Sequence, residues 1–306
     1  MRKGLIIILS ILFCSAIFAQ QVPITSQYVM NRLVVNPAYA GELGFYSASI
    51  SYRKQWINLE GAPTTQNVSI HGPAMKGKLG FGLLYMRDII GVSKQNSISG
   101  SFAYKVKMKK KRTLSFGLAG TAVFYNNQWS KINTTEDNDV AFAADSPQYI
   151  YPDFSAGIYY KTSKYYIGFS TPAFLEHQLS TNSSNYKIKN DFNEYNYLLE
   201  AGMDFKITDK INLKPSFMSR YLPSSAYQLD LNLLLDYNNT IGFGISYRTQ
   251  DAVVGMVQMH LTDQIILGYS FDQTISKLQK YNNGSHEVFL RYDFRYKVKT
   301  FDPRFF

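Results

Sequence analysis

The stretch HEVFLRYDFRY, residues 286–296, alternates between apolar and polar residues near the end of the 306-residue chain. Alternation with a period of two indicates a β-strand whose two faces differ in polarity. The apolar face must meet either a protein core, with the charges in water, or lipid, with the charges directed inward. One face carries Val288, Leu290, Tyr292, Phe294 and Tyr296, the other carries Glu287, Arg291, Asp293 and Arg295, and only Phe289 breaks the pattern.

The same pattern recurs along the chain, which predicts about fourteen strands. The clearest of them are about as long as a strand that crosses a bilayer at a tilt. Several begin or end on Tyr, where the aromatic girdles of a membrane barrel would fall, and the chain contains 24 Tyr and 21 Phe. The predicted strands are 46–56, 64–71, 78–88, 98–108, 113–125, 154–161, 165–171, 197–207, 211–221, 227–237, 241–248, 252–261, 264–272 and 286–296.

The connections between these strands alternate in length. A soluble β-sandwich or β-propeller has no reason to sort its connections in this way, whereas an outer-membrane barrel has short periplasmic turns and long outer loops. The sequence therefore predicts an all-β fold, a closed transmembrane antiparallel outer-membrane β-barrel with both mature ends in the periplasm. Polar turns stand at 109–111, 162–163, 208–209, 238–239 and 262–263, longer links at 57–63, 89–95, 127–152, 172–195, 222–226 and 273–285, and only 249–250 departs from the alternation.

Residues 1–19 have the layout of a secretory signal peptide. A short basic start precedes an apolar run from Gly4 to Phe13, which is too short to span a bilayer permanently, and cleavage is expected after Ala19. The only cysteine, Cys14, lies in this leader, so no disulfide is expected in the mature protein. A formal charge of +10 often indicates nucleic-acid binding, but an exported protein is expected to bind none.

Residues 20–43 do not alternate and are predicted to form a periplasmic or lumenal segment ahead of the barrel, which spans 44–306. Ser26 is a suitable N-cap for a short helix with one apolar stripe. Asn36-Pro37 would end that helix, because the residue before a proline avoids the helical region. The stripe would comprise Val29, Met30, Leu33 and Val34.

Several motifs follow one another in the order found in a known family. They are SQYVMNRLVVNPAYAGE (26–42), YRKQWINLEGAPTTQNVSIHGP (52–73), YYIGFSTP (165–172), ISYRTQDAVVGMV (245–257), LGYSFDQTIS (267–276), GSHEVFLRYDF (284–294) and DPRFF (302–306). With these motifs the chain resembles the PorP/SprF family of outer-membrane proteins over nearly the whole mature length. This family belongs to the type IX secretion and gliding motility machinery, and the resemblance implies a fourteen-stranded barrel in the cell outer membrane.

The resemblance also implies partners. They are a secreted protein with a type IX C-terminal signal, such as an adhesin, and periplasmic ring components of the secretion system, besides the lipid of the outer membrane. The family has no catalytic residues to transfer to this chain. The candidate contacts for a plug or a partner are Tyr28, Asn36, Pro37, Tyr39, Gly41 and Trp56.

The sequence predicts no catalytic site, no cofactor and no metal site. Ser285-His286-Glu287 cannot form a hydrolase triad, because neighbouring strand residues point to opposite faces. The acidic run 136–139, with Asp145, has oxygen ligands suited to calcium but lacks the glycine and terminal glutamate of an EF-hand loop, and a solvated loop is the alternative. The basic run 107–112 is either a solvated turn or a docking point for an acidic periplasmic partner.

The lumen of a fourteen-stranded barrel should hold more space than its wall side chains fill. Charges of both signs are expected inside it and favour mutual pairing, so residues 21–43 are expected to plug the pore or its periplasmic mouth. Glycines on the lumenal face allow either tight coiling or close approach of another backbone. The expected lumenal residues are Glu200, Asp204, Lys206, Asp230, Arg291 and Asp293, together with Gly80, Gly82, Gly242 and Gly244.

The leading functional hypothesis is an interaction protein that helps a type IX secreted partner reach or stay on the cell surface. The long outer loops 127–152 and 172–195 are rich in Tyr, Asn and Ser, a composition that suits adaptable contact surfaces. A diffusion porin or small-molecule transporter is the alternative, and an outer-membrane enzyme is third.

Overall fold

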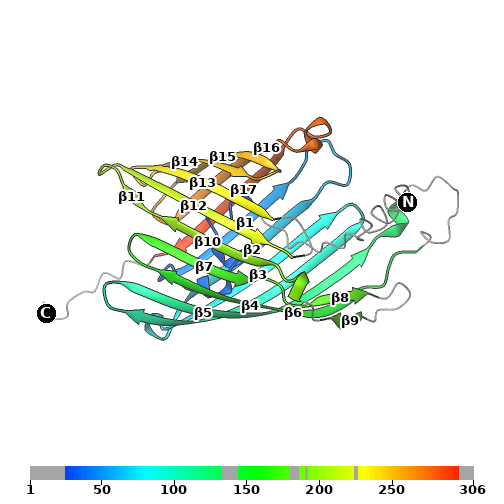
Figure 1. The fold of residues 1–306 in the computed structure, drawn as a ribbon, viewed down its shortest axis with the longest axis horizontal. Helices are drawn as coiled ribbons and strands as arrows, with labels where there is room; N and C mark the ends of the chain where they lie inside the picture. Colours follow the sequence, from blue (N-terminus) through cyan, green and yellow to red (C-terminus); the bar gives the residue numbers. More distant parts are fainter. Residues whose placement is uncertain (1–24, 133–143, 180–185, 190–191, 224–226, 296–306) are drawn as a thin grey trace, which may run out of the picture.

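The computed structural model describes residues 25–132, 144–179, 186–189, 192–223 and 227–295. One antiparallel sheet curls into a closed barrel, because β10 pairs with β12 and so joins the two ends of the strand order (Figure 1). A break at Asp204 separates β10 from the two-residue strand β11, which pairs with β12. The wall is therefore a fourteen-stranded barrel with one extra strand, as the sequence predicts.

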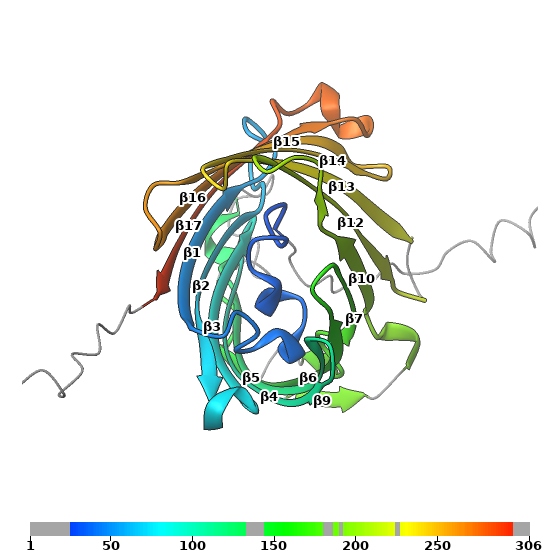
Figure 2. The ribbon, with the colours of Figure 1, turned by 90° about the vertical axis from the view of Figure 1, so that its left-hand side faces the viewer.

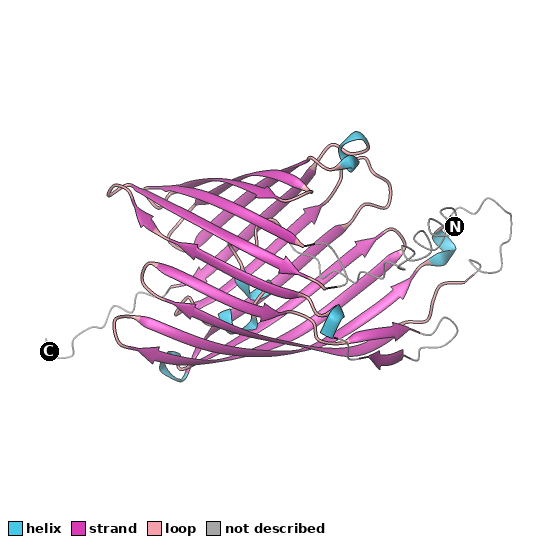
Figure 3. Ribbon diagram, in the orientation of Figure 1, coloured by secondary structure: helices cyan, strands magenta, loops and turns pink. Residues whose placement is uncertain are grey.

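Strands account for most of the described chain, and helices are confined to short 3-10 turns (Figure 3). The wall strands are β1 Tyr46–Lys54, β2 Thr64–Ala74, β3 Leu79–Ile90, β4 Ser93–Met108, β5 Arg112–Asn127, β6 Tyr149–Lys161, β7 Tyr165–Thr171, β10 Tyr197–Met203, β11 Phe205–Lys206, β12 Ile211–Tyr221, β13 Gln228–Tyr237, β14 Ile241–Arg248, β15 Ala252–His260, β16 Ile265–Thr274 and β17 Ser285–Phe294. A separate hairpin pairs β8 Glu176–Leu179 with β9 Tyr186–Lys189, and the 3-10 turns are η1 Arg32–Val34, η2 Pro37–Tyr39, η3 Met75–Gly77, η4 Trp129–Lys131, η6 Phe192–Glu194 and η7 Lys277–Lys280.

The two faces of β17 settle which side is apolar. Val288 and Leu290 are 47% and 42% exposed, whereas Glu287 and Asp293 are completely buried. Large apolar side chains are exposed on the outer face of strand after strand. Because the charges point into the barrel and the apolar residues point outward, the outer face forms the belt that lipid covers.

The connections sort by length onto the two ends of the barrel, as predicted, with short turns at the left of Figure 1 and, apart from 91–92 and 249–251, longer links at the right. One expected long link is wrong: β3 and β4 are joined only by Gly91-Val92. Residues 93–97 are all polar and extend β4 beyond the apolar belt. Alternation therefore marked only the part of this strand that faces lipid. The short turns are 75–78, 109–111, 162–164, 207–210, 238–240 and 261–264, and the links at the other end are 55–63, 91–92, 128–148, 172–196, 222–227, 249–251 and 275–284.

Residues 25–45 run through the inside of the barrel and are called the lumenal segment (Figure 2). The predicted helix capped by Ser26 is wrong, because the segment contains only the 3-10 turns η1 and η2. Asn36-Pro37 begins η2: the Asn36 side chain accepts a hydrogen bond from the Ala38 amide, and Pro37 occupies the first position. None of the helices in the described chain is long and apolar enough to cross a membrane.

The lumenal segment begins near the end of the barrel opposite to the one at which the wall begins. Tyr46 pairs with Phe294, so the barrel starts and ends at the short-turn end. Ser26, however, contacts Arg53, near the opposite end of β1. The chain therefore passes from the long-link end to the short-turn end before the first strand begins. The signal peptide 1–19 and residues 20–24 lie outside the described residues.

Cysteines placed at Asp209 and Tyr281 test the orientation of the barrel. Asp209 lies in the short turn 207–210 and Tyr281 in the long link 275–284, and both side chains are exposed. We expect a membrane-impermeant maleimide to label Tyr281→Cys on intact cells, and Asp209→Cys only after the outer membrane is permeabilised. Labelling of Asp209→Cys on intact cells would invert the orientation.

Candidate functional site

The candidate site is the lumenal segment together with the wall residues that hold it. Near the long-link end of the barrel, Ser26 lies among buried charges from β1, β14, β16 and β17. The Ser26 hydroxyl donates to Asp272 Oδ2 at 2.6 Å, and the Ser26 amide donates to Glu287 Oε2 at 2.7 Å. The same hydroxyl accepts hydrogen bonds from Arg53 at 2.8 Å and Arg248 at 3.2 Å. Four wall strands therefore meet at one residue of the segment.

These wall charges also pair with one another, and this ion cluster is defined by Arg53, Arg248, Asp230, Asp272 and Glu287. Arg53 lies 2.8 Å from Asp272 and 3.3 Å from Glu287. Arg248 lies 3.2 Å from Asp230 and 3.5 Å from Asp272. All five side chains are buried. A buried charge is strongly destabilising unless it is paired, so each member depends on the others.

The middle of the segment is held by polar contacts to the opposite wall. Arg32 lies 3.4 Å from the buried carboxylate of Glu200 on β10. Its guanidinium donates to the Tyr166 hydroxyl at 2.8 Å and lies 4.1 Å from the centre of the Tyr166 ring. Ser170 on β7 donates to the carbonyl of Val35 at 2.6 Å. These contacts tie the segment to β7 and β10, two of the shortest strands in the wall.

Five of the six candidate contact residues lie in the lumenal segment, and all five are buried. The Tyr28 hydroxyl accepts a hydrogen bond from Asn232 at 2.6 Å. Tyr39 packs edge-on against Tyr159, with 5.5 Å between ring centres. The Gly41 amide donates to His71 Nδ1 at 3.1 Å. The five residues are Tyr28, Asn36, Pro37, Tyr39 and Gly41.

Trp56, the sixth candidate, lies apart from these five. It follows β1 in the link 55–63 at the long-link end, where its amide donates to the Ser285 hydroxyl at 3.1 Å. Ser285 and Glu287 are buried, whereas His286, between them, is hydrogen-bonded to the hydroxyl of the exposed Tyr269 at 2.6 Å. His286 therefore points to the face opposite to that of Ser285 and Glu287, as the sequence predicts.

Glycines on the lumenal face bring the wall backbone against the segment. A Cβ at Gly80 would collide with the carbonyl of Ala40, and one at Gly117 would collide with the backbone of Ala38. Gly157 likewise leaves room for the side chain of Asn36. The sequence flagged Gly80 for either tight coiling or close backbone approach, and the structure shows the second; it missed Gly117 and Gly157, which stand in similarly alternating strands. Gly82 lies against Leu33, and Gly242 and Gly244 lie against wall side chains.

At the short-turn end, the segment is held by Glu42. Its carboxylate lies 3.3 Å from Lys105 on β4 and 3.5 Å from Lys161 on β6. Gly41, one residue earlier, has a φ of +68°, and a Cβ there would lie 2.7 Å from the carbonyl oxygen of Gly72. Only glycine suits this position, because other residues are strained at positive φ and the space is already filled.

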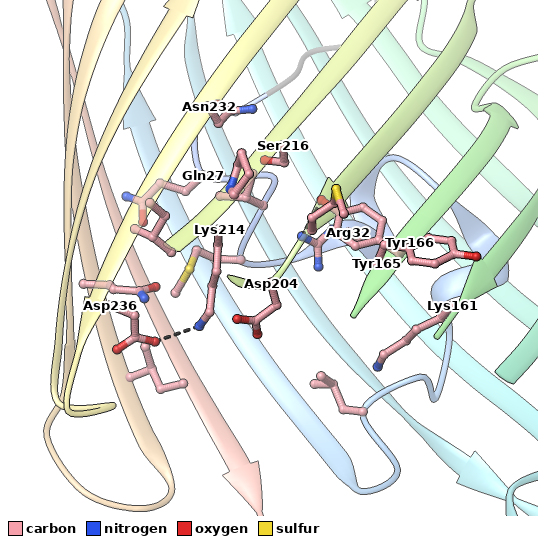
Figure 4. A pocket seen from close by; sticks show the side chains of 18 of the residues that line it. Gln27, Arg32, Lys161, Tyr165, Tyr166, Asp204, Lys214, Ser216, Asn232 and Asp236 are labelled. Carbon is pink, nitrogen blue, oxygen red and sulfur yellow. Dashed lines mark hydrogen bonds and ion pairs between the residues drawn. The ribbon is translucent and has the colours of Figure 1, made fainter. Parts of the chain in front are cut away.

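Beside the segment, a cavity of about 450 Å³ extends to the short-turn end (Figure 4). Arg32 and Gln27 line it from the segment, and Lys214 lies 2.7 Å from Asp236 on the facing wall. The volume is in the range of small-ligand pockets. Of the predicted lumenal charges, Asp204 and Arg291 line this cavity, and Glu200, Asp230 and Asp293 are buried. The prediction for Lys206 is wrong, because its side chain is largely exposed and pairs with Asp209 at the short-turn end.

The acidic run weighed as a calcium site, 136–139, falls outside the described residues, which omit 133–143. Asp145 accepts hydrogen bonds from the Ser130 hydroxyl and amide, and these lower the pKa of its carboxyl. Among the residues that the structure describes, no group of His, Cys, Asp and Glu could hold a metal ion.

A closed barrel with a lipid-facing apolar belt and a charged lumen defines an outer-membrane β-barrel protein. The family model "Type IX secretion system membrane protein PorP/SprF" matches residues 17–292. The chain belongs to this PorP/SprF family, and its location is the outer membrane.

Solved structures similar to this chain are also outer-membrane barrels. Omp33 of Acinetobacter baumannii aligns with a TM-score of 0.49 at 6% identity, covering 82% of this chain and 98% of that one. A FadL homologue of Pseudomonas aeruginosa aligns with a TM-score of 0.46 at 11% identity, covering 85% of this chain and 93% of that one. The translocator domain of the autotransporter NalP from Neisseria meningitidis aligns with a TM-score of 0.44 at 11% identity, covering 82% of this chain and 88% of that one. The comparison with curated proteins finds no match.

Replacing Arg53 tests the ion cluster. Arg53→Met leaves Asp272 and Glu287 without their shortest cationic contact, and breaking a buried pair in this way costs about 3–5 kcal/mol. We expect a clear fall in the temperature at which the purified barrel loses its heat-modifiable migration on a denaturing gel. The control Lys206→Met removes an exposed pair and should change that temperature little. Equal shifts in the two variants would contradict the role of the cluster.

Proposed function

We propose that this barrel is closed by its lumenal segment and helps a type IX secreted partner, such as an adhesin, reach or stay on the cell surface. Family membership supports the place in type IX secretion. The observation that carries the rest is the occupied lumen. A filled lumen argues against solute passage and for a role of the surface at the long-link end, which the proposal places outside the cell. Gliding motility and contact with periplasmic ring components are further parts of this proposal.

The surface at the long-link end, called the outer end from here on, supports a role in holding a protein. Phe192, Tyr221, Tyr227 and Tyr281 are exposed on or beside the links at the outer end. Tyr195, which is buried, lies between Phe174 and Phe192, with 5.3 Å and 5.0 Å between ring centres. Aromatic side chains combine a large contact area with few rotatable bonds, which suits protein recognition. This aromatic outer end is the surface we assign to the partner.

A small-molecule transporter is the second candidate function, and the cavity of about 450 Å³ is the observation in its favour. A solute entering that cavity from the short-turn end would still meet the ion cluster around Ser26. Transport would therefore require the outer end of the segment to move. We rank it below the protein-holding role for that reason.

Gly117→Val tests whether the lumenal segment closes the barrel. The new side chain would collide with the backbone of Ala38 and push η2 away from β5. We expect low conductance from the wild-type protein in planar bilayers and higher conductance from Gly117→Val. Gly120→Val on the same strand is the matched control, because a Cβ at Gly120 meets no atom within 4 Å. Large, steady conductance from the wild type, or unchanged conductance in Gly117→Val, would refute closure by this segment.

Deleting the gene and comparing surface proteomes tests the function itself. We expect loss of one or a few large surface proteins while nutrient uptake stays intact. Complementation with Gly120→Val should restore them. An unchanged surface proteome combined with impaired uptake of one solute would favour the transporter.

A further inference from the structure

Three neighbouring turns at the short-turn end together present a basic surface. They are the β2–β3 turn with Lys76 and Lys78, the β4–β5 turn with the run 109–112, and the β6–β7 turn with Lys164. We call this surface the basic crescent. All of its Lys and Arg side chains are exposed, and none of these turns contains an Asp or Glu.

The other half of the same rim differs in charge. Its turns 207–210 and 261–264 contain acidic residues, Asp209 and Asp263, and Lys206 pairs with Asp209 at 2.7 Å. The turn 238–240 is uncharged. Among the turns that the structure describes at this end, the excess of positive charge therefore lies on the side of the barrel formed by β2–β7. The positive net charge of the chain does not by itself explain this one-sided distribution.

Backbone geometry makes the crescent's lysines unusual. Lys110 and Lys111 have φ values of +60° and +55°, a left-handed conformation that favours Gly and Asn. In the β13–β14 turn, the matching positive-φ pair is Asn238 and Asn239, at +53° and +49°. The chain thus uses the locally favourable residue on one side of the rim and lysine on the other. The charge at the crescent is retained against the preference of the backbone.

The crescent lies directly at the edge of the lipid-facing belt. The outward face of β4 stays apolar through Val106 to Met108, which is 40% exposed and adjoins the basic turn. Met75, beside Lys76, is 72% exposed. Since a strand advances about 3.3 Å per residue, the lysine ammonium groups stand at the depth of the phospholipid headgroups. At that depth the nearest anions are lipid phosphates.

We propose that the basic crescent binds anionic phospholipid headgroups, of the phosphatidylglycerol type, in the periplasmic leaflet of the outer membrane. Clustered Lys and Arg beside an apolar membrane-facing surface attract anionic lipids. Binding on the β2–β7 side alone would give the barrel a preferred lipid neighbourhood on one face. An acidic protein is the other class of partner for such charge, and the position beside the apolar belt favours lipid over it.

The test compares lipid retention by the purified full-length barrel in detergent micelles. Native mass spectrometry counts bound phosphatidylglycerol or phosphatidylcholine with identical acyl chains. We expect the wild type to retain phosphatidylglycerol preferentially. K110N/K111N should weaken that binding about fivefold per lysine at low ionic strength. Because Asn suits the left-handed backbone, this variant should keep its heat-modifiable migration, which separates lost binding from lost folding.

Adding N238K/N239K to K110N/K111N restores the net charge on the wrong side of the rim and is the matched control. We expect it to leave phosphatidylglycerol binding weak. Equal retention of both lipids by the wild type, unchanged binding by K110N/K111N, or full recovery in the control would each overturn the proposal. Capture of an acidic periplasmic protein by a photocrosslinker at Lys110, with lipid binding unaffected by K110N/K111N, would assign the crescent to a protein instead.

Discussion

The hydrogen-bonded contact between Ser26 and the ion cluster is the interaction on which the rest of the lumen depends. Two arginines and three carboxylates are buried there, and the Ser26 amide and hydroxyl provide further hydrogen bonds to two of the carboxylates. A wall of fourteen strands encloses more space than its own side chains fill, so the interior needs a filling that pairs its charges. The lumenal segment supplies it, with Arg32 facing Glu200 and Glu42 facing Lys105.

Much of the fold was predictable because lipid imposes a strict pattern. A strand with lipid on one face and a charged lumen on the other must alternate, and β17 does so through Leu290 and Arg291. Where both faces meet water, the constraint disappears, and the start of β4 at Ser93 was missed for that reason. The helix expected after Ser26 does not form, and the reason lies in the hydrogen bonds that the wall offers. Wall side chains such as Ser170 satisfy the segment's backbone groups, so a regular helix is not needed.

The candidate site was predictable only in part. Asn36, Tyr39 and Gly41 stand out in a family-like motif, but their partners lie in strands far along the chain, and no spacing rule connects them. Gly117 shows the same limit from the side of the wall. Its alternation with apolar residues is ordinary for a strand, and only the approach of Ala38 reveals why a larger residue does not fit. Trp56 stands in the next family-like motif, 52–73, and lies outside the lumenal segment, since proximity in sequence to a plug does not place a residue in it.

The direction in which the lumenal segment runs has a consequence for assembly. Three of the four residues bonded to Ser26 follow it by 222 to 261 positions, so Ser26 is synthesised long before these three partners. Contacts of such long sequence separation form late in folding. The seam between β1 and β17 closes last in chain order, and Glu287 arrives with it. Docking of the chain's beginning is therefore coupled to completion of its end, so a barrel that has not finished closing cannot yet be sealed.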